Sequence, residues 1–155
     1  MAVYFFDSSA IVKRYVAEPG TAWVVATCDP ATGNDLYAAR IAGVEVVAAI
    51  VRRTRRGDLS PAHMRQAVAQ FRREFATGLY RLIEVTPTLI QRAMGLSETH
   101  GLRGYDAVQL AAALSANDVR LTMGLKALTL VSADGELNTA AQAEGLSVDN
   151  PNLHP

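Results

Sequence analysis

The chain has 155 residues, enough for one domain with an ordinary hydrophobic core. It is 50% hydrophobic and 19% charged, a balance that excludes a disordered chain. Its apolar runs are too short and too interrupted to cross a bilayer, and the N-terminus has no signal-peptide pattern. We therefore expect a cytoplasmic protein. The single cysteine, Cys28, excludes an internal disulfide and is expected to be a small core residue.

The formal net charge is zero, but the charges are unevenly distributed. Between Arg40 and Arg81 there are nine arginines and three acids, whereas from Gly104 onward there are two basic residues and six acids. A basic region beside an acidic one suits a protein that holds a polyanion against a cation-binding site. The basic run from Arg52 to Arg56 is explained equally well as a solvated helix end that interacts favourably with the helix dipole.

The first half of the chain alternates between strand and helix patterns. Four apolar residues at 3–6 predict a buried strand that runs directly into Asp7. Helical spacing follows over 9–17 and again over 21–28, where Thr21 is a candidate helix cap. A second strand is expected at 36–39, followed by a long helix at 41–56 that Gly57 ends.

The second half continues the alternation. Ser60 followed by proline marks a helix start, and an apolar stripe extends that helix toward Gly78. Strands are expected at 79–85, 128–132 and 146–148, and helices from 86 to about 100, from 104 and from about 135 to 144. The segment 117–126 has no clear pattern. This order predicts an α/β domain with a mostly parallel sheet of about five strands at 1–150, and a short tail at 151–155.

Four acidic residues follow strands or begin helices: Asp7, Glu45, Asp106 and Asp134. Strand ends and the helix starts after them share one rim of a parallel sheet, so we expect these side chains to converge. Carboxylates held close together repel one another unless a cation neutralises them, and oxygen ligands favour Mg²⁺ or Mn²⁺ over zinc. For Asp7 alone, a role as a helix cap is an equally good explanation.

A cation in such a site can polarise a phosphodiester and lower the pKa of a bound water, which predicts phosphodiester hydrolysis. Ser9 and Ser132 have the right size to hydrogen-bond the carboxylates or the substrate, although helix capping explains either serine about as well. None of the three histidines has a Ser or Cys context that resembles a nucleophile elbow, and the chain contains no glycine-rich phosphate loop.

The sequence resembles the PIN-domain ribonucleases, specifically the VapC-type toxins of bacterial toxin–antitoxin pairs. The matching pieces span nearly the whole chain: F-F-D-S-S-A-I-V-K-R-Y, G-V-E-V-V-A-A-I, G-L-R-G-Y-D-A-V-Q-L-A-A-A-L, L-V-S-A-D-G-E-L and E-G-L-S-V-D-N-P. The resemblance implies a three-layer α/β/α fold, endoribonuclease activity that depends on Mg²⁺ or Mn²⁺, homodimerisation, and inhibition by a small antitoxin.

The resemblance also assigns residues. The family's acids fall on Asp7, Glu45, Asp106 and Asp134, and Glu136 could share or replace the role of Asp134. Antitoxins of this family place a helix and a tail over the toxin, often with a basic side chain in the acidic pocket. The helix at 64–75 and the end of the preceding helix are the candidate clamp for this partner.

Two other functions fit parts of the pattern. In a non-catalytic PIN-like binding domain, the acids would only receive an arginine of the partner or support the fold. In an aspartyl-phosphate phosphatase or receiver, Asp7 would carry a phosphoryl group. Phosphatases of that type have a second aspartate two residues after the nucleophile, where this chain has Ser9, and receivers need an acidic pair near the first strand.

Overall fold

Five short parallel strands form the centre of the protein in the computed structural model, which describes residues 1–154. The strands lie in the order β3-β2-β1-β4-β5, and each neighbouring pair is parallel. Their bounds are β1 (Val3–Phe6), β2 (Asp35–Ala39), β3 (Arg81–Ile83), β4 (Thr129–Val131) and β5 (Ser147–Asp149). The predicted α/β class, the parallel sheet and the number of strands are confirmed.

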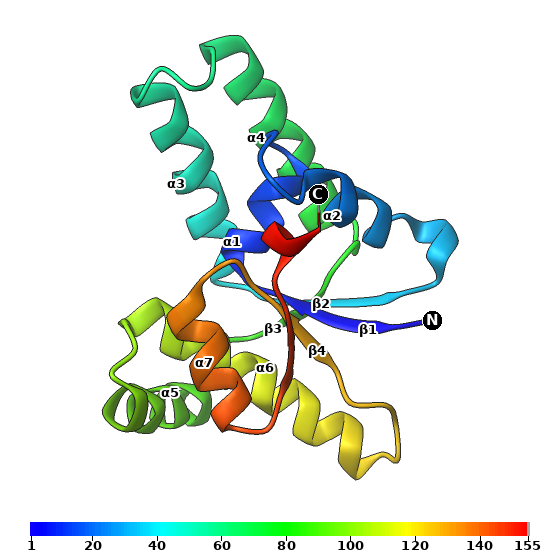
Figure 1. The fold of residues 1–155 in the computed structure, drawn as a ribbon, viewed down its shortest axis with the longest axis vertical. Coiled ribbons are helices and arrows are strands. Elements are labelled where there is room, and N and C mark those ends of the chain that lie inside the picture. The colour runs from blue at the N-terminus through cyan, green and yellow to red at the C-terminus, as the bar shows by residue number, and fades with distance from the viewer. Residues whose placement is uncertain (155) are drawn as a thin grey trace.

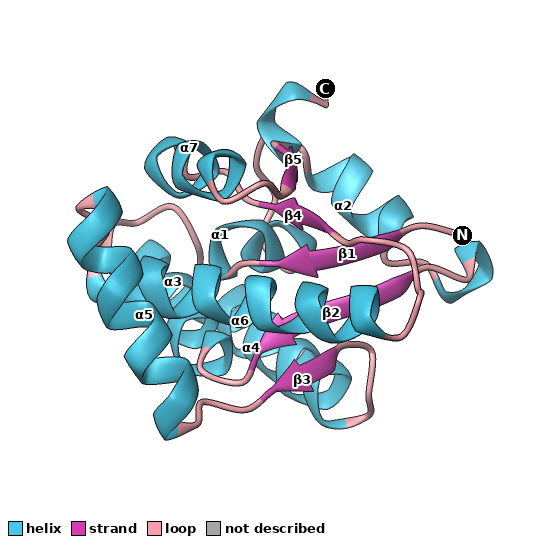
Figure 2. Ribbon diagram, turned by 90° about the horizontal axis from the view of Figure 1, so that it is seen from below, coloured by secondary structure: helices cyan, strands magenta, loops and turns pink. Residues whose placement is uncertain are grey.

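Helices cover both faces of this sheet (Figures 1 and 2). One face carries α1 (Ser8–Ile11), α2 (Thr21–Thr27), α3 (Ala42–Arg55) and α4 (Pro61–Ala76). The other carries α5 (Pro87–His100), α6 (Gly104–Thr122) and α7 (Gly135–Ala143). Short 3₁₀ turns lie at Val12–Arg14, Pro30–Thr32 and Pro151–Leu153. Within residues 1–154, no helix is long and apolar enough to cross a membrane.

The central strand β1 explains why the sheet has a core on each side. Successive side chains of a strand point to opposite faces, so Phe5 packs with α5–α7 and Phe6 packs with α1–α4. Both phenylalanines are 0% exposed. A strand that is buried on both faces reads as a continuous apolar run, which is the pattern at 3–6. The three-layer α/β/α arrangement is therefore confirmed.

The strand order creates a switch point between β1 and β4. From β1 the chain extends the sheet through β2 and β3, then returns to the other side of β1 to form β4 and β5. In parallel sheets of this kind, ligands bind in the crevice at the carboxyl ends of the strands beside such a point. The backbone N–H of Asp7 donates to Val131 O at 3.1 Å, so the residues after β1 and after β4 meet there.

Two local predictions differ from the structure. The helix expected at 9–17 is a single α-helical turn, α1, followed by a 3₁₀ turn that ends at Arg14. Thr21 is not the cap of α2, because Gly20 occupies that position with φ 85°. The Thr21 hydroxyl instead accepts a hydrogen bond from Glu18 N at 3.0 Å and closes the turn before the helix.

The segment without a clear pattern, 117–126, begins as the last two turns of α6. Two of its polar side chains are buried, which hides the helical periodicity. Asn117 Oδ1 accepts from Leu128 N at 3.0 Å, and Arg120 donates to Lys126 O at 2.8 Å and to the Tyr37 hydroxyl at 2.9 Å. These bonds hold the turn that leads into β4.

Candidate active site

Asp7 is the most buried of the predicted site carboxylates, with only 2% of its surface exposed. It follows β1 directly and caps α1. Its Oδ1 accepts hydrogen bonds from the Ser9 hydroxyl at 2.7 Å and from Ala10 N at 3.1 Å. The pKa of Asp7 is raised to about 7, mainly by burial and in smaller part by the nearby Glu45 carboxylate, while the hydrogen bonds from Ser9 and Ala10 oppose the rise. Asp7 does cap α1 through its Oδ1. A residue that only caps a helix, however, does not need to be buried this deeply.

Glu45 lies in the first turn of α3 and is held from two other helices. The Ser8 hydroxyl of α1 donates to Glu45 Oε2 at 2.5 Å, and Gln109 Nε2 of α6 donates to Glu45 Oε1 at 3.3 Å. Each carboxylate oxygen therefore has a donor, and these two hydrogen bonds restrict the rotation of the side chain.

Gln109 was not predicted to belong to the site. It is 1% exposed, and its Oε1 has no hydrogen-bond partner. A buried amide oxygen without a partner costs stability, so the position is not optimised for folding alone. Gln109 lies three residues after Asp106 on α6, and residues at this spacing share a helix face. That spacing is the sequence signal from which it could have been found.

Asp106 lies in the first turn of α6 and is partly buried. Burial is the main cause of its raised pKa, and the carboxylates of Asp134, Glu45 and Glu136 raise the pKa further. Arg103 opposes this rise. The structure therefore brings acids from α3, α6 and the start of α7 close enough to repel one another.

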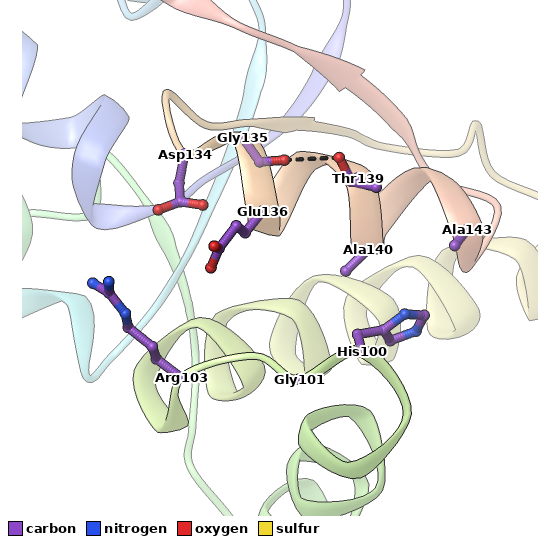
Figure 3. A pocket seen from close by; sticks show the side chains of 9 residues that line it. All are labelled: His100, Gly101, Arg103, Asp134, Gly135, Glu136, Thr139, Ala140 and Ala143. Carbon is purple, nitrogen blue, oxygen red and sulfur yellow. Dashed lines mark hydrogen bonds between the residues drawn. The ribbon is translucent and has the colours of Figure 1, made fainter.

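Asp134 caps α7, where its Oδ1 accepts from Leu137 N at 2.9 Å. Glu136 follows in the first turn and is exposed. Figure 3 shows both carboxylates and the Arg103 guanidinium directed toward the space between α7 and the start of α6. Of the two acids, Asp134 raises the pKa of Asp106 more than Glu136 does.

The two predicted serines connect the ends of β1 and β4. The Ser9 hydroxyl donates to Asp7 and accepts from Ala133 N at 2.9 Å. The Ser132 side chain is fully buried, and its Oγ accepts from Asp134 N at 3.0 Å. Aspartates, and not these serines, cap α1 and α7, so capping does not account for either serine.

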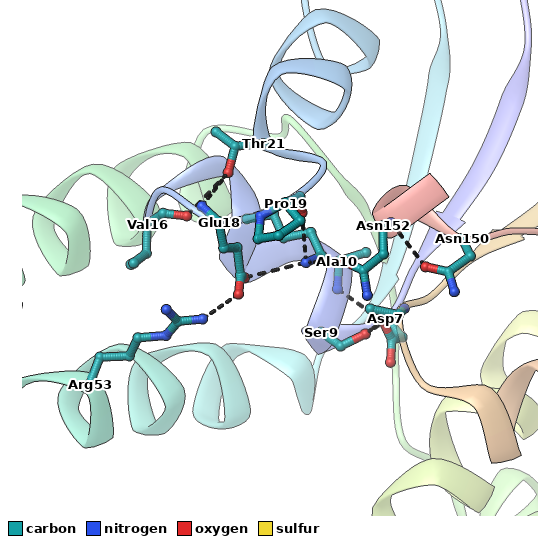
Figure 4. A network of polar contacts seen from close by, with 12 residues as sticks. Asp7, Ser9, Ala10, Val16, Glu18, Pro19, Thr21, Arg53, Asn150 and Asn152 are labelled. Atoms are coloured by element: carbon teal, nitrogen blue, oxygen red, sulfur yellow. Dashed lines mark hydrogen bonds and ion pairs between the residues drawn. The ribbon is translucent and has the colours of Figure 1, made fainter. Parts of the chain in front are cut away.

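A buried lysine holds the C-terminal turn against this region through Pro19 and Asn152, two residues whose positions near Ser9 are shown in Figure 4. Lys13 is 3% exposed and donates to Pro19 O at 2.9 Å and to Asn152 Oδ1 at 2.8 Å. It also pairs with Glu18 at 3.7 Å, and Glu18 in turn pairs with Arg53. The C-terminal turn thus closes one side of a pocket that reaches Ser9. Residue 155, the end of the predicted tail, lies outside the described residues.

The candidate antitoxin clamp is an apolar groove between α3 and α4. Val47 and Val51 of α3 face Phe71 and Phe75 of α4 across it. Four arginines also line the groove: Arg40, Arg52, Arg55 and Arg72. Part of the basic surplus of the sequence therefore lies around an apolar floor beside the acidic rim.

The predicted acids offer a divalent cation only oxygen donors. Among residues 1–154, no three His, Cys, Asp or Glu side chains lie close enough to form a ready-made metal-binding group. Mg²⁺, however, usually keeps several waters and is held by only one or two carboxylates. Asp7 and Asp106 both have raised pKa values, so a cation would relieve the cost of ionising them. An all-oxygen site with this electrostatic strain fits a hard cation.

Comparisons with known proteins give two full-length relatives. No family model matches the chain. Ribonuclease VapC45 of Mycobacterium tuberculosis strain CDC 1551 / Oshkosh and Ribonuclease VapC49 of strain ATCC 25618 / H37Rv are each 34% identical over 158 residues. These matches cover 100% of this chain and 100% of each relative.

Solved structures show the same fold at lower identity. FitAB bound to a DNA fragment has a TM-score of 0.64 at 16% identity, covering 96% of this chain and 94% of that one. VapBC2 from Rickettsia felis, bound to a DNA fragment from its promoter, has a TM-score of 0.59 at 13% identity and covers 96% and 98%. A toxin–antitoxin complex from Klebsiella pneumoniae has a TM-score of 0.58 at 16% identity and covers 97% and 98%.

Proposed function

The chain belongs to the VapC ribonucleases, and on this premise we propose that it is an endoribonuclease toxin that hydrolyses RNA phosphodiesters with the help of a divalent cation. The observation that carries the proposal is electrostatic: Glu45 raises the pKa of both Asp7 and Asp106, and Asp134 also raises that of Asp106. Two of these acids, Asp7 and Asp106, have raised pKa values. Such a cluster is costly to maintain without a ligand that offsets its charge.

Asp7, Asp106 and Asp134 would hold the cation, and Glu45 would complete the set. A bound Mg²⁺ or Mn²⁺ supplies polarisation of the phosphodiester and a water of lowered pKa. The chain's own residues prepare the site for that ion. Ser9 fixes one oxygen of Asp7, and the hydrogen bonds from Ser8 and Gln109 keep the Glu45 carboxylate from rotating away.

Arg103 supplies the positive charge at the mouth of the site. Its side chain forms no ion pair or hydrogen bond with any described residue, although it is close enough to Asp106 to lower that residue's pKa. A guanidinium with free donors beside acidic groups can bind the phosphate oxygens of the substrate as they approach. We therefore assign Arg103 to substrate binding and not to the cation.

The partner proposed for the toxin is a small antitoxin, because the neighbouring structures include toxin–antitoxin complexes. An apolar helix of such a partner would cover Val47, Val51, Phe71 and Phe75 in the α3–α4 groove. Acidic residues at the edges of that helix would face the arginines around the groove. We also propose that the toxin forms a homodimer, which light scattering of the isolated chain would test.

Cleavage of a structured RNA tests the proposal. We expect product with Mg²⁺ or Mn²⁺, none with EDTA, and a strong loss of rate in Asp106→Asn. Asp58→Asn is the matched control, because Asp58 is exposed in a loop and has no side-chain partner among the described residues. Equal rates under all these conditions would refute the proposal.

The alternative is a non-catalytic binding domain, in which the acids would only receive an arginine of the partner or support the fold. It predicts tight binding of an antitoxin without any metal-dependent turnover of RNA. The same assay therefore separates the two functions, provided that antitoxin binding is measured on the same preparation.

A further inference from the structure

A second opening reaches the acidic rim from between α3 and α6. Its walls include Ser8, Glu45 and Ala48 on one side, with Arg52 further along α3 and Tyr105 at the start of α6. We call this opening the α3–α6 pocket. It shares Glu45 and the two serines after Asp7 with the candidate active site, so a substrate strand that crosses the site would continue into it.

Tyr105 is an aromatic residue with little role in the fold. It is 54% exposed, and its hydroxyl has no hydrogen-bond partner among the described residues. It lies in the first turn of α6, directly before Asp106, so its ring stands beside the acidic site. The neighbouring wall residue Val44 is 63% exposed, which leaves an apolar surface open next to the ring.

Arg52 provides a positive charge within the same pocket. It is exposed and forms no ion pair within residues 1–154, whereas its neighbour Arg53 pairs with Glu18. Arg52 lies seven residues after Glu45 on α3, which is about 10.5 Å along the helix axis. A phosphate bound by Arg52 is therefore a flanking phosphate of the strand, and not the one that is cleaved.

We propose that the α3–α6 pocket is a nucleotide subsite in which an unpaired RNA base stacks on Tyr105 and a flanking phosphate binds Arg52. This inference rests on the proposed ribonuclease function and names its substrate class. The bases of a duplex are already stacked on one another, so only single-stranded or looped RNA can offer a free base face to an aromatic ring.

Binding of RNA in a cleavage-deficient background tests the subsite. The probe is a fluorescein-labelled unpaired RNA of twelve nucleotides, compared with the same strand in a duplex, by anisotropy at low ionic strength in Asp7→Asn protein. Tyr105→Ala, Tyr105→Phe and Arg52→Ala are added to this background. Met123→Ala and Lys126→Ala are matched controls, since they remove an exposed apolar side chain and one positive charge near the far end of α6.

We expect Tyr105→Ala to weaken binding of the unpaired RNA roughly tenfold, as removal of one stacking ring does. Tyr105→Phe keeps the ring and stays within about twofold of the parent protein. Arg52→Ala weakens binding and lowers the salt dependence by about one counterion, as loss of one phosphate contact does. The two controls bind like the parent, and the duplex is insensitive to both Tyr105 variants.

Three results would overturn the subsite. In the first, Tyr105→Ala binds the unpaired RNA as well as the parent does. In the second, Tyr105→Phe loses as much affinity as Tyr105→Ala, which would assign the effect to the hydroxyl. In the third, the duplex loses as much as the unpaired strand. If instead these binding results are as expected but wild-type protein shows no metal-dependent cleavage, the proposed function fails and the subsite stands.

Discussion

Replacing Asp7 by asparagine should make the metal-free protein more stable while it abolishes cleavage. In the folded protein the pKa of Asp7 is about 7, against an ordinary value of 3.8. A difference of about 3 between the two pKa values means that ionisation of this carboxylate lowers the free energy of unfolding by at most about 4 kcal/mol. Asparagine has the shape of the protonated acid, and its Oδ1 can accept the same bonds from Ser9 and Ala10.

The direction of this stability change with pH follows from proton linkage. The folded protein holds the Asp7 proton more tightly than the unfolded chain does, so the contribution of Asp7 to the stability of the metal-free wild type is fully present below about pH 4. That contribution is lost as the pH rises through about 7. Asp7→Asn lacks this titration. The gain of the variant should therefore be small at pH 4 and largest at pH 8, where the melting temperature rises by about 10 °C at the 4 kcal/mol maximum.

The assay is urea unfolding of both proteins in EDTA at several pH values, repeated at pH 8 with Mg²⁺. We expect Mg²⁺ to stabilise the wild type and to have a much smaller effect on Asp7→Asn. Asp29→Asn is a control, because Asp29 also caps a short helical turn but is exposed. If Asp7→Asn is no more stable than the wild type at pH 8, the carboxylate is not under the electrostatic strain on which this reasoning depends.

Three further predictions concern the surroundings of the site. Gln109→Leu should keep the free energy of unfolding within about 1 kcal/mol of the wild type, because it removes a buried oxygen that has no partner. It should nevertheless lower kcat about tenfold, because Glu45 loses one of its two hydrogen bonds. A fall in stability that matches the fall in kcat would show a structural role instead. Glu74→Gln should lower the free energy of unfolding in urea by about 2–3 kcal/mol, because it breaks a largely buried ion pair with Arg14. Glu84→Gln breaks an exposed pair with Arg40 and should lower it by less than about 1 kcal/mol. Equal losses in the two variants would contradict this reasoning. Gly20→Ala should lower the free energy of unfolding by at least about 2 kcal/mol. Gly20 has φ 85°, and the new Cβ would lie 2.2 Å from a carbonyl oxygen of the C-terminal turn. An unchanged melting temperature would show that this turn is not tightly docked.

The fold was predictable because most of its elements carry strong local signals. The buried strand at 3–6 and the proline-marked helices after Ser60 and Thr86 are confirmed. The failures have physical causes. The 117–126 segment buries Asn117 and Arg120 in hydrogen bonds to distant or backbone groups, so its periodicity does not follow hydrophobicity.

The site was predictable only in part. Acids at strand ends and helix starts can be placed on one rim from topology alone, which is why the sequence predicts that Asp7, Glu45, Asp106 and Asp134 converge. The hydrogen bonds that hold Glu45 could not be predicted in this way, because the contacts of Ser8 and Gln109 depend on the packing of three helices. The roles of the site residues in binding a cation stay predictions.

The most direct test of the central claim is the anomalous scattering of a crystal of the protein soaked with Mn²⁺. The account predicts a peak at the β1–β4 switch point, with carboxylate oxygens of Asp7 and Asp106 within about 2.2 Å of the ion and waters in its remaining positions. An ion bound elsewhere, or no ion at these carboxylates in a protein that still cleaves RNA, would contradict it.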